Sequence, residues 1–129
     1  MDKVIFRCAI CKVALSEPLA ELQERKKPCY DLEYVPRGYF VIADEEFGRA
    51  SIGHHVINLQ DARNTAHYPD QRGLFGCCGP SGFDGVNTVC INGHGIGTEH
   101  SDCHVMQGLE LEPGCAEIER LSINEEMEH

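Results

Sequence analysis

The run Val-Ile-Phe-Arg-Cys-Ala-Ile-Cys at residues 4–11 decides the expected fold. Val4, Ile5 and Phe6 form a short β-branched and aromatic stretch, which predicts a strand. The stretch leads directly into Cys8 and Cys11, and two residues between two cysteines let the chain wrap a metal ion with both sulfurs on one side. A strand that enters a tight C-x-x-C turn is typical of half of a structural zinc site.

Eight cysteines in 129 residues suggest either a disulfide framework or a metal site. Small disulfide scaffolds are usually secreted and shorter than about 100 residues. The N-terminus MDKVIFRC has neither the basic region nor the long apolar stretch of a signal peptide. The cysteines therefore favour metal binding, and we expect a cytoplasmic protein.

The second half of the site has no C-x-x-C of its own, so its ligands are inferred from local context. Cys78 precedes Gly79, which resembles the end of a metal-binding turn, whereas the adjacent Cys77 would point the other way in an extended segment. Cys90 is the next candidate, and Cys77 and Cys103 are the substitutes for this pair. The sequence thus predicts one structural zinc ion bound by Cys8, Cys11, Cys78 and Cys90.

The remaining cysteines and the histidines carry weaker signals. Cys29 and Cys115 lie in polar or acidic surroundings and are predicted to be free thiols. His94 or His104 would suit a catalytic zinc with an open position, but a structural site is favoured. Cys103 and His104 are adjacent and point to opposite faces of a strand, which disfavours a catalytic dyad. No catalytic residue is predicted, and a protein without enzymatic activity is favoured.

A second function class stays open from the same residues. Cys8 and Cys11 form the C-x-x-C of redox-active thiols, and Cys77 and Cys78 are vicinal. The preferred hypothesis is a zinc-binding structural or interaction module without catalysis. The alternative is a thiol redox or metal-handling protein that uses these two cysteine pairs.

The pattern along the chain predicts a small, β-rich α+β single domain with five or six strands, one or two short helices and a zinc-ribbon-like cysteine site. Ser16 and Pro18 favour a short helix that ends near Lys26, with an irregular connection as the alternative. Asn58 or Asp61 is expected to cap a single helical turn.

Glycines are frequent between residues 73 and 97, and residues 93–98 are expected to form a hairpin turn. Strands are predicted over residues 39–43, 55–59, 86–91 and 105–111.

The formal net charge of −10 argues against binding to nucleic acid, which requires a basic face. No apolar run reaches the roughly 18 residues of a membrane span, so membrane binding is not expected, and a protein partner is the remaining class. The acidic residues are dense near the C-terminus. We therefore expect a zinc-stabilised domain over residues 1–112 and an acidic tail over residues 113–129, partly helical or disordered.

A longer motif links the two cysteine regions. After the N-terminal C-x-x-C, the chain carries G-C-C-G-x-x-G-x-x-G-x-N-x-x-C from Gly76 to Cys90, preceded by His67, Asp70 and Arg72. This combination resembles a family of uncharacterised small bacterial proteins. The resemblance implies no established activity. Members of that family tend to carry Cys-x-Cys-Gly where this chain has residues 90–93, so Asn92 stands in the place of a thiol. We interpret His67, Asp70 and Arg72 as structural groups against the glycine-rich loop.

Overall fold

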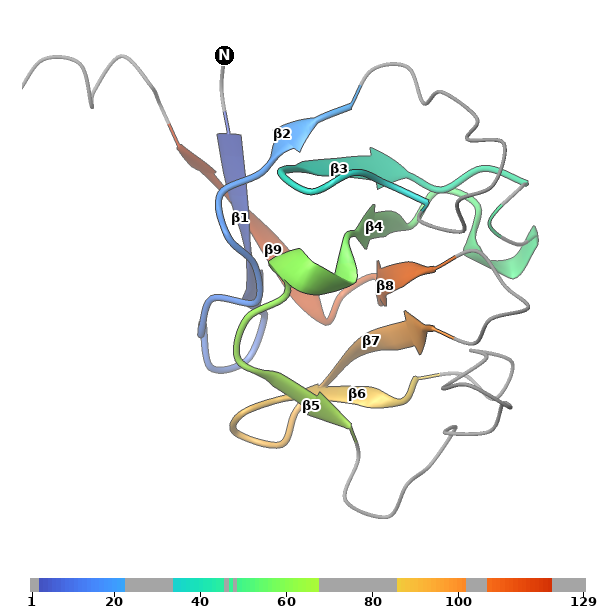
Figure 1. The fold of residues 1–129 in the computed structure, drawn as a ribbon. Coiled ribbons are helices and arrows are strands. Elements are labelled where there is room, and N and C mark those ends of the chain that lie inside the picture. The colour runs from blue at the N-terminus through green and yellow to red at the C-terminus, as the bar shows by residue number, and fades with distance from the viewer. Residues whose placement is uncertain are drawn as a thin grey trace, which may run out of the picture.

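Seven of the nine strands in the described residues form one sheet (Figure 1). The computed structural model describes residues 3–22, 34–45, 47, 49–67, 86–101 and 107–121. Along the sheet the strand order is β2-β3-β4-β8-β7-β6-β5, and neighbours are antiparallel except for the parallel pair β2 and β3. The strands are β2 (Ala20–Glu21), β3 (Tyr39–Ile42), β4 (His55–Ile57), β5 (Thr65–His67), β6 (Thr88–Cys90), β7 (Gly95–His100) and β8 (Gly108–Leu111). The β-rich small domain expected from the sequence is confirmed.

Two further strands form a separate antiparallel pair beside the sheet, visible on the left of Figure 1. β1 (Lys3–Cys8) pairs along its whole length with β9 (Ala116–Leu121). Residues 116–121 were expected to belong to an acidic tail outside the domain. That expectation is wrong for these six residues, because their backbone groups complete the edge of β1. Residues 122–129 lie outside the described residues.

The two faces of the main sheet carry different cores, because side chains alternate along each strand. Cross-strand pairing aligns Phe40, Ile57 and Leu109 on one face. This face packs against Phe6 of β1 and Leu19 in the larger hydrophobic cluster. Burying such side chains typically stabilises the fold by about 1.5–3 kcal/mol each. The larger cluster therefore holds the β1–β9 pair against the sheet.

The second face carries a smaller core and one buried carboxylate. Pairing aligns Val41, Val56 and Glu110 in the next row. Val41 and Val56 pack with Tyr34 in the smaller cluster, and Glu110 is also buried. A charged residue in such a position requires hydrogen-bonding partners, and the carboxylate of Glu110 contacts His54 Nδ1 and lies 3.0 Å from His100 Nε2.

The segment after the first cysteine turn is extended, so the helix predicted to start at Ser16 is wrong over its described part. Val4 and Leu19 exchange two backbone hydrogen bonds of 2.7 and 2.8 Å, and the Leu15 N–H donates to the Phe6 carbonyl at 2.7 Å. The Ser16 hydroxyl accepts the Phe6 N–H at 3.1 Å instead of capping a helix. Leu15 and Leu19 are completely buried. Pairing with β1 therefore overrides the local helix signals, as tertiary contacts often do.

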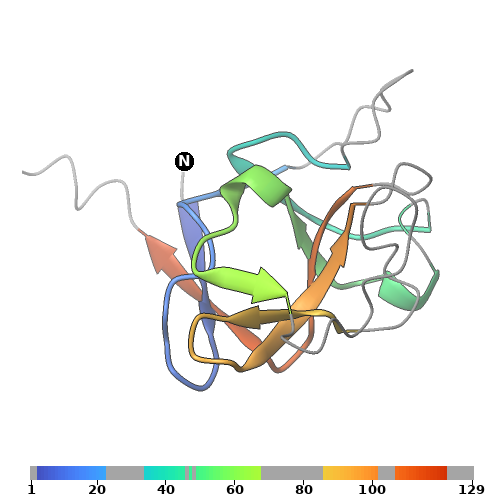
Figure 2. The ribbon, with the colours of Figure 1, turned by 60° about the horizontal axis from the view of Figure 1, so that its bottom comes forward.

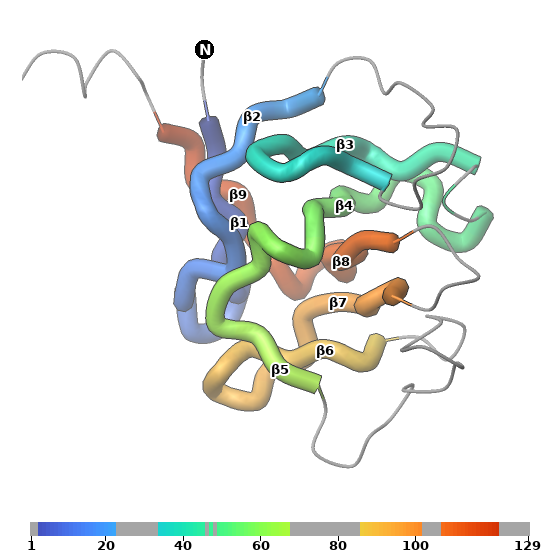
Figure 3. The backbone as a smooth tube through the Cα atoms, viewed as in Figure 1, coloured from blue at the N-terminus to red at the C-terminus, as the bar shows by residue number. Residues whose placement is uncertain are grey.

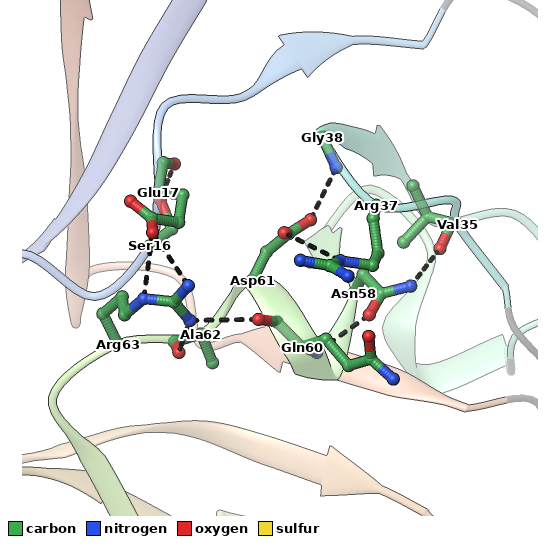
Figure 4. Close-up of polar contacts among 10 residues, drawn as sticks. All are labelled: Ser16, Glu17, Val35, Arg37, Gly38, Asn58, Gln60, Asp61, Ala62 and Arg63. Carbon is green, nitrogen blue, oxygen red and sulfur yellow. Dashed lines mark hydrogen bonds and ion pairs between the residues drawn. The ribbon is translucent and has the colours of Figure 1, made fainter.

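Helical structure in the described residues is limited to two 3₁₀ turns, η1 (Arg49–Ser51) and η2 (Leu59–Asp61). Asn58 caps η2, because its side-chain oxygen accepts the Gln60 N–H at 2.8 Å while its amide donates to the Val35 carbonyl at 2.9 Å (Figure 4). The structure thus has a three-residue 3₁₀ turn at the place where a single helical turn was expected. Among the described residues, no helix is long and apolar enough to span a membrane.

The buried carboxylate of Asp61 joins η2 to the start of β3 (Figure 4). It accepts the Gly38 N–H at 2.7 Å and lies 3.9 Å from the Arg37 guanidinium. Gly38 has a φ of +88°, a conformation that favours glycine. The Asp61 backbone carbonyl accepts the Glu17 N–H at 3.0 Å. These contacts hold the segment before β2 and the segment before β3 on the same turn.

Candidate metal centre

The first loop of the site follows β1 and contains the C-x-x-C predicted to bind metal. The Lys12 N–H donates to the Cys8 carbonyl at 2.9 Å, and the Cys8 N–H donates to the Val13 carbonyl at 3.0 Å. Lys12 has a φ of +66°, so the chain reverses within this turn. The loop is also tied to the C-terminal part of the chain, because the Ala9 N–H donates to the Cys115 carbonyl at 3.0 Å. Cys8 and Cys11 are thereby held on one short turn.

The second loop joins β6 to β7 and has a similar pattern of hydrogen bonds. The Gly93 N–H donates to the Cys90 carbonyl at 2.9 Å, and the Cys90 N–H donates to the His94 carbonyl at 2.8 Å. Gly93 supplies the left-handed residue, with a φ of +88°. The Asn92 N–H points to the Cys90 sulfur at 3.4 Å. This loop therefore presents Cys90 and His94 together.

The two loops meet at one end of the domain, as the tube in Figure 3 and the rotated view in Figure 2 show. Ligand atoms of Cys8, Cys11, Cys90 and His94 all lie within 4.8 Å of one another. The sulfurs of Cys11 and Cys90 are 3.7 Å apart. His94 Nδ1 lies 3.7 Å from the Cys8 sulfur and 3.4 Å from the Cys90 sulfur. Three thiols and one imidazole form a cluster that could hold a metal ion.

The environment of the cluster stabilises thiolate at one position. Hydrogen bonds from the Asn92 side chain and the Val13 backbone lower the pKa of the Cys11 thiol to about 6. Burial raises the pKa of the Cys90 thiol, although hydrogen bonds from the backbone of its loop oppose this. Cys8 and Cys90 are buried, whereas Cys11 and His94 are partly exposed. Without a metal, the Cys11 thiol is thus largely ionised at neutral pH.

The structure brings together three of the four ligands predicted from the sequence. Cys8, Cys11 and Cys90 belong to the cluster. Cys78, the fourth predicted ligand, lies outside the described residues, as do its neighbour Cys77 and the other substitute, Cys103. Cys115, predicted to be a free thiol, has no disulfide and does not belong to the four-residue cluster. Cys29 also lies outside the described residues.

Sequence reasoning named His94 as a possible zinc ligand but did not include it in the structural site, and so missed its place in this cluster. The available signal was the spacing of Cys90 and His94, with Gly93 between them at the position that reverses the chain. A C-x-x-x-H run can place two ligands on one ion in a tight hairpin or on one face of a helix, so the spacing alone does not specify this turn. Residues 93–98 were expected to be a hairpin turn, but the turn ends at His94 and β7 begins at Gly95. Without β7, the relation between Cys90 and His94 could not be recognised.

Parts of the motif that suggested a family resemblance have a structural role here. Asn87 is fully buried, and its side-chain oxygen accepts the Glu99 N–H at 2.7 Å while its amide donates to the Glu99 carbonyl at 3.1 Å. The Nε2 atom of His67 lies 2.9 Å from the Glu99 carboxylate. Asp70 and Arg72 lie outside the described residues. Asn87 therefore fastens the chain before β6 to β7.

Comparisons with known proteins return no relative for this chain. No protein-family model matches it, no curated protein matches it, and no solved structure matches it. The resemblance to small bacterial proteins stays a prediction from the sequence motifs.

Proposed function

We propose that this protein is a zinc-binding structural and interaction module without catalytic activity. One Zn²⁺ is held by the sulfurs of Cys8, Cys11 and Cys90 and by Nδ1 of His94. The observation that carries the proposal is the mutual approach of these four ligand atoms within 4.8 Å. We place the protein in the cytoplasm, where the reducing conditions keep the thiols available for metal.

The distances within the cluster support zinc. Tetrahedral zinc has Zn–S bonds of about 2.3 Å and Zn–N bonds of about 2.0–2.1 Å, so its ligand atoms should be about 3.8 Å apart for two sulfurs and about 3.5–3.6 Å apart for sulfur and nitrogen. The observed sulfur–sulfur distance is 3.7 Å, and the two sulfur–nitrogen distances are 3.4 and 3.7 Å. Three thiolates and an imidazole are also a ligand set typical of structural zinc.

A structural role follows from the number of protein ligands. Four protein atoms complete a tetrahedron, whereas catalytic zinc keeps one position for water or substrate. The ion would connect residue 8 to residue 94 and so crosslink a long segment of the chain, where a crosslink restricts the unfolded state most in theory. The two loops would then act as the paired metal-binding turns of a zinc-ribbon-like site.

The interaction part of the proposal rests on the outer surface of the same loops. Ile10 is 70% exposed and Ile91 is 61% exposed. Each isoleucine lies next to a cysteine of the cluster, so a bound ion would determine their relative positions. Exposed apolar side chains that lie together on a surface are typical of interaction sites. A protein partner is the class of partner that such side chains suit.

The decisive experiment is metal analysis of protein purified without added metal. We expect one zinc per chain in the parent protein, and less than a tenth of that in Cys11→Ser and His94→Ala. Cys78→Ser tests the ligand predicted from the sequence alone, and we expect it to retain zinc. Zinc loss in Cys78→Ser together with retention in His94→Ala would overturn the proposed ligand set.

Thiol redox or metal-handling activity is the second candidate, because the low pKa of Cys11 and its contact with Cys90 are also features of a reactive thiol pair. The same experiment separates the two functions. Protein that contains no metal and forms a reversible disulfide between two of the cluster cysteines would establish the redox function instead. Cys77 and Cys78, the other pair considered for this chemistry, lie outside the described residues.

A further inference from the structure

The strand β9 has one edge that pairs with no other part of the described chain. β9 pairs along its whole length with β1, and among the described residues no further strand pairs with it. Residues 117–120 are exposed, and in Figure 1 the C-terminal half of β9 lies to the left of the seven-stranded sheet. An unpaired edge presents backbone donors and acceptors that a further strand can use.

The hydrogen bonds of β1 determine which backbone groups of β9 face this edge. Successive residues of an antiparallel strand point their N–H and C=O groups to opposite sides. Val4 of β1 exchanges two backbone hydrogen bonds with Leu19, so its groups point away from its β9 partner, Arg120. The backbone groups of Arg120, and those of Ile118 two residues before it, therefore face the free edge.

The other end of the β1–β9 pair has the same alternation. The Ala9 N–H donates to the Cys115 carbonyl at 3.0 Å, so the odd-numbered residues of this segment bond toward β1. Glu117 and Glu119 belong to this odd-numbered set. Their N–H groups are already used in the pair with β1, in contrast to the outward groups of the even-numbered residues.

The side chains beside the free edge alternate in character. Glu117 and Glu119 lie on one face of β9, and Ile118, which is 38% exposed, lies on the other. The two carboxylates pair with Lys12 and Arg7 but remain partly exposed. A carboxylate has enough lone pairs to accept further donors. A strand added to this edge would place its own residues directly opposite the two glutamates.

A second copy of β9 does not suit this edge. If Ile118 pairs with Ile118 of a second copy, Glu117 of each copy lies opposite Glu119 of the other. If Ile118 pairs with Arg120, the two copies of Glu119 lie opposite each other. Like charges in directly opposite positions destabilise a sheet. Residues 122–129 contain three glutamates and no lysine or arginine, so the end of the chain is equally unsuited to pair here.

We propose that the free edge of β9 binds an extended segment of a protein partner in which basic and apolar residues alternate. The backbone groups of Ile118 and Arg120 form its hydrogen bonds, as in other cases of strand addition. Basic residues lie opposite Glu117 and Glu119, and an apolar residue packs beside Ile118. The formal charge of −10 on the chain attracts such a segment. This surface uses none of the cluster ligands, so its failure would leave the proposed zinc function unaffected.

Three acetylated and amidated pentapeptides test the proposal by NMR titration of the full-length protein as purified. Their sequences are Lys-Val-Lys-Val-Lys, Lys-Lys-Val-Val-Lys and Glu-Val-Glu-Val-Glu, which vary the alternation and the charge separately. We expect the alternating basic peptide to bind about tenfold more tightly than either of the others.

Amide hydrogen exchange in the same samples identifies the edge that binds. With the alternating basic peptide at saturation, exchange should slow at Ile118 and Arg120 and stay unchanged at Glu117 and Glu119, whose N–H groups already bond to β1. Equal affinity for the alternating basic and acidic peptides, or unchanged exchange at both Ile118 and Arg120, would overturn the proposal.

Variants locate the pairing. Arg120→Pro removes one outward N–H and no hydrogen bond to β1, and edge strands tolerate proline. It also removes a positive charge, which alone would favour a basic peptide, so the expected loss of about tenfold in affinity reports the backbone bond. Glu117→Gln/Glu119→Gln should abolish the preference for the basic peptide, which keeps the test decisive if Arg120→Pro does not fold. Glu17→Gln/Glu45→Gln changes the charge equally outside β9 and should keep the preference. Parent-like affinity in folded Arg120→Pro, or parent-like preference in Glu117→Gln/Glu119→Gln, would refute the site.

Discussion

The sulfur of Cys11 lies 3.7 Å from the sulfur of Cys90, although 79 positions separate the two residues in the chain. This distance is too long for a disulfide bond and close to the edge of a zinc–thiolate tetrahedron. The contact exists because two hairpin-like loops, one after β1 and one after β6, reach the same end of the domain. The metal cluster is thus a property of the fold as much as of the C-x-x-C motif.

Loss of a cluster cysteine should destabilise the whole domain. We expect Cys8→Ser and Cys90→Ser to lose zinc and to lower the melting temperature by at least 10 °C, because structural zinc binding contributes directly to the free energy of folding. Thermal unfolding followed by circular dichroism measures the effect. Cys115→Ser is the matched control, since Cys115 does not belong to the four-residue cluster, and its melting temperature should change by only a few degrees. Equal losses in all three variants would contradict a specific role for the cluster.

Acid should remove the stabilisation provided by Glu110. Burial raises the pKa of this carboxyl, but hydrogen bonds from His100, His54 and Ser51 outweigh that effect and lower the pKa in the folded state. Its contribution is therefore complete above the unfolded-state pKa and is lost as the pH falls through the folded-state pKa. Glu110→Gln should therefore be less stable than the parent at pH 7, by about 1–3 kcal/mol. The difference should shrink steadily below about pH 4.5.

Denaturant unfolding of parent and Glu110→Gln at pH 7, 5, 4 and 3 provides this comparison. Acid also releases metal from thiolates, but both proteins carry the same cluster, so the difference between them isolates the carboxyl. A difference that stays constant from pH 7 to pH 3 would show that Glu110 does not titrate with unfolding.

The sequence predicts those elements whose signals are local. Residues 39–43 and 55–59 are apolar, β-branched runs, and the structure has β3 and β4 there. The capping of η2 by Asn58 is also a local signal. Cys8 and Cys11 were recognised because two ligands separated by two residues need only one turn.

Elements that depend on distant partners were missed. Residues 116–121 belong to the glutamate-rich end of the chain, which the sequence predicts to be a solvated tail. In the structure β1 offers them an unpaired edge, and Arg7 and Lys12 pair with Glu119 and Glu117. The segment from Ser16 has the local features of a helix start, yet β1 draws it into an extended conformation. His94 was missed as a cluster ligand for the same reason, because its neighbourhood is created by the pairing of β6 with β7.

A methyl group at Gly97 should be more damaging than one at Gly108. A Cβ at Gly97 would lie 2.2 Å from the backbone carbonyl oxygen of Glu110, whereas a Cβ at Gly108 would meet the side-chain Cγ1 of Val56 at 2.7 Å. Backbone in the neighbouring strand cannot move without breaking the β7–β8 pairing, but a side chain can shift. We expect Gly97→Ala to lower the free energy of unfolding by about 3 kcal/mol or more, and Gly108→Ala to lower it by about 1–3 kcal/mol. Urea unfolding measures both, and equal costs would contradict the strand register found here.

Removal of β9 should abolish stable folding, although an acidic tail would be dispensable. A chain that ends after Glu112 lacks all six residues that pair with β1, and the Ala9 N–H loses the Cys115 carbonyl beside the metal loop. We expect this truncation to lose cooperative thermal unfolding and to bind zinc at least tenfold more weakly. Glu119→Gln is the control, because it removes only the partly exposed ion pair with Arg7. It should lower the free energy of unfolding by less than about 1 kcal/mol. If the truncated chain unfolds cooperatively at the parent's melting temperature, the pairing of β9 with β1 contributes nothing to stability.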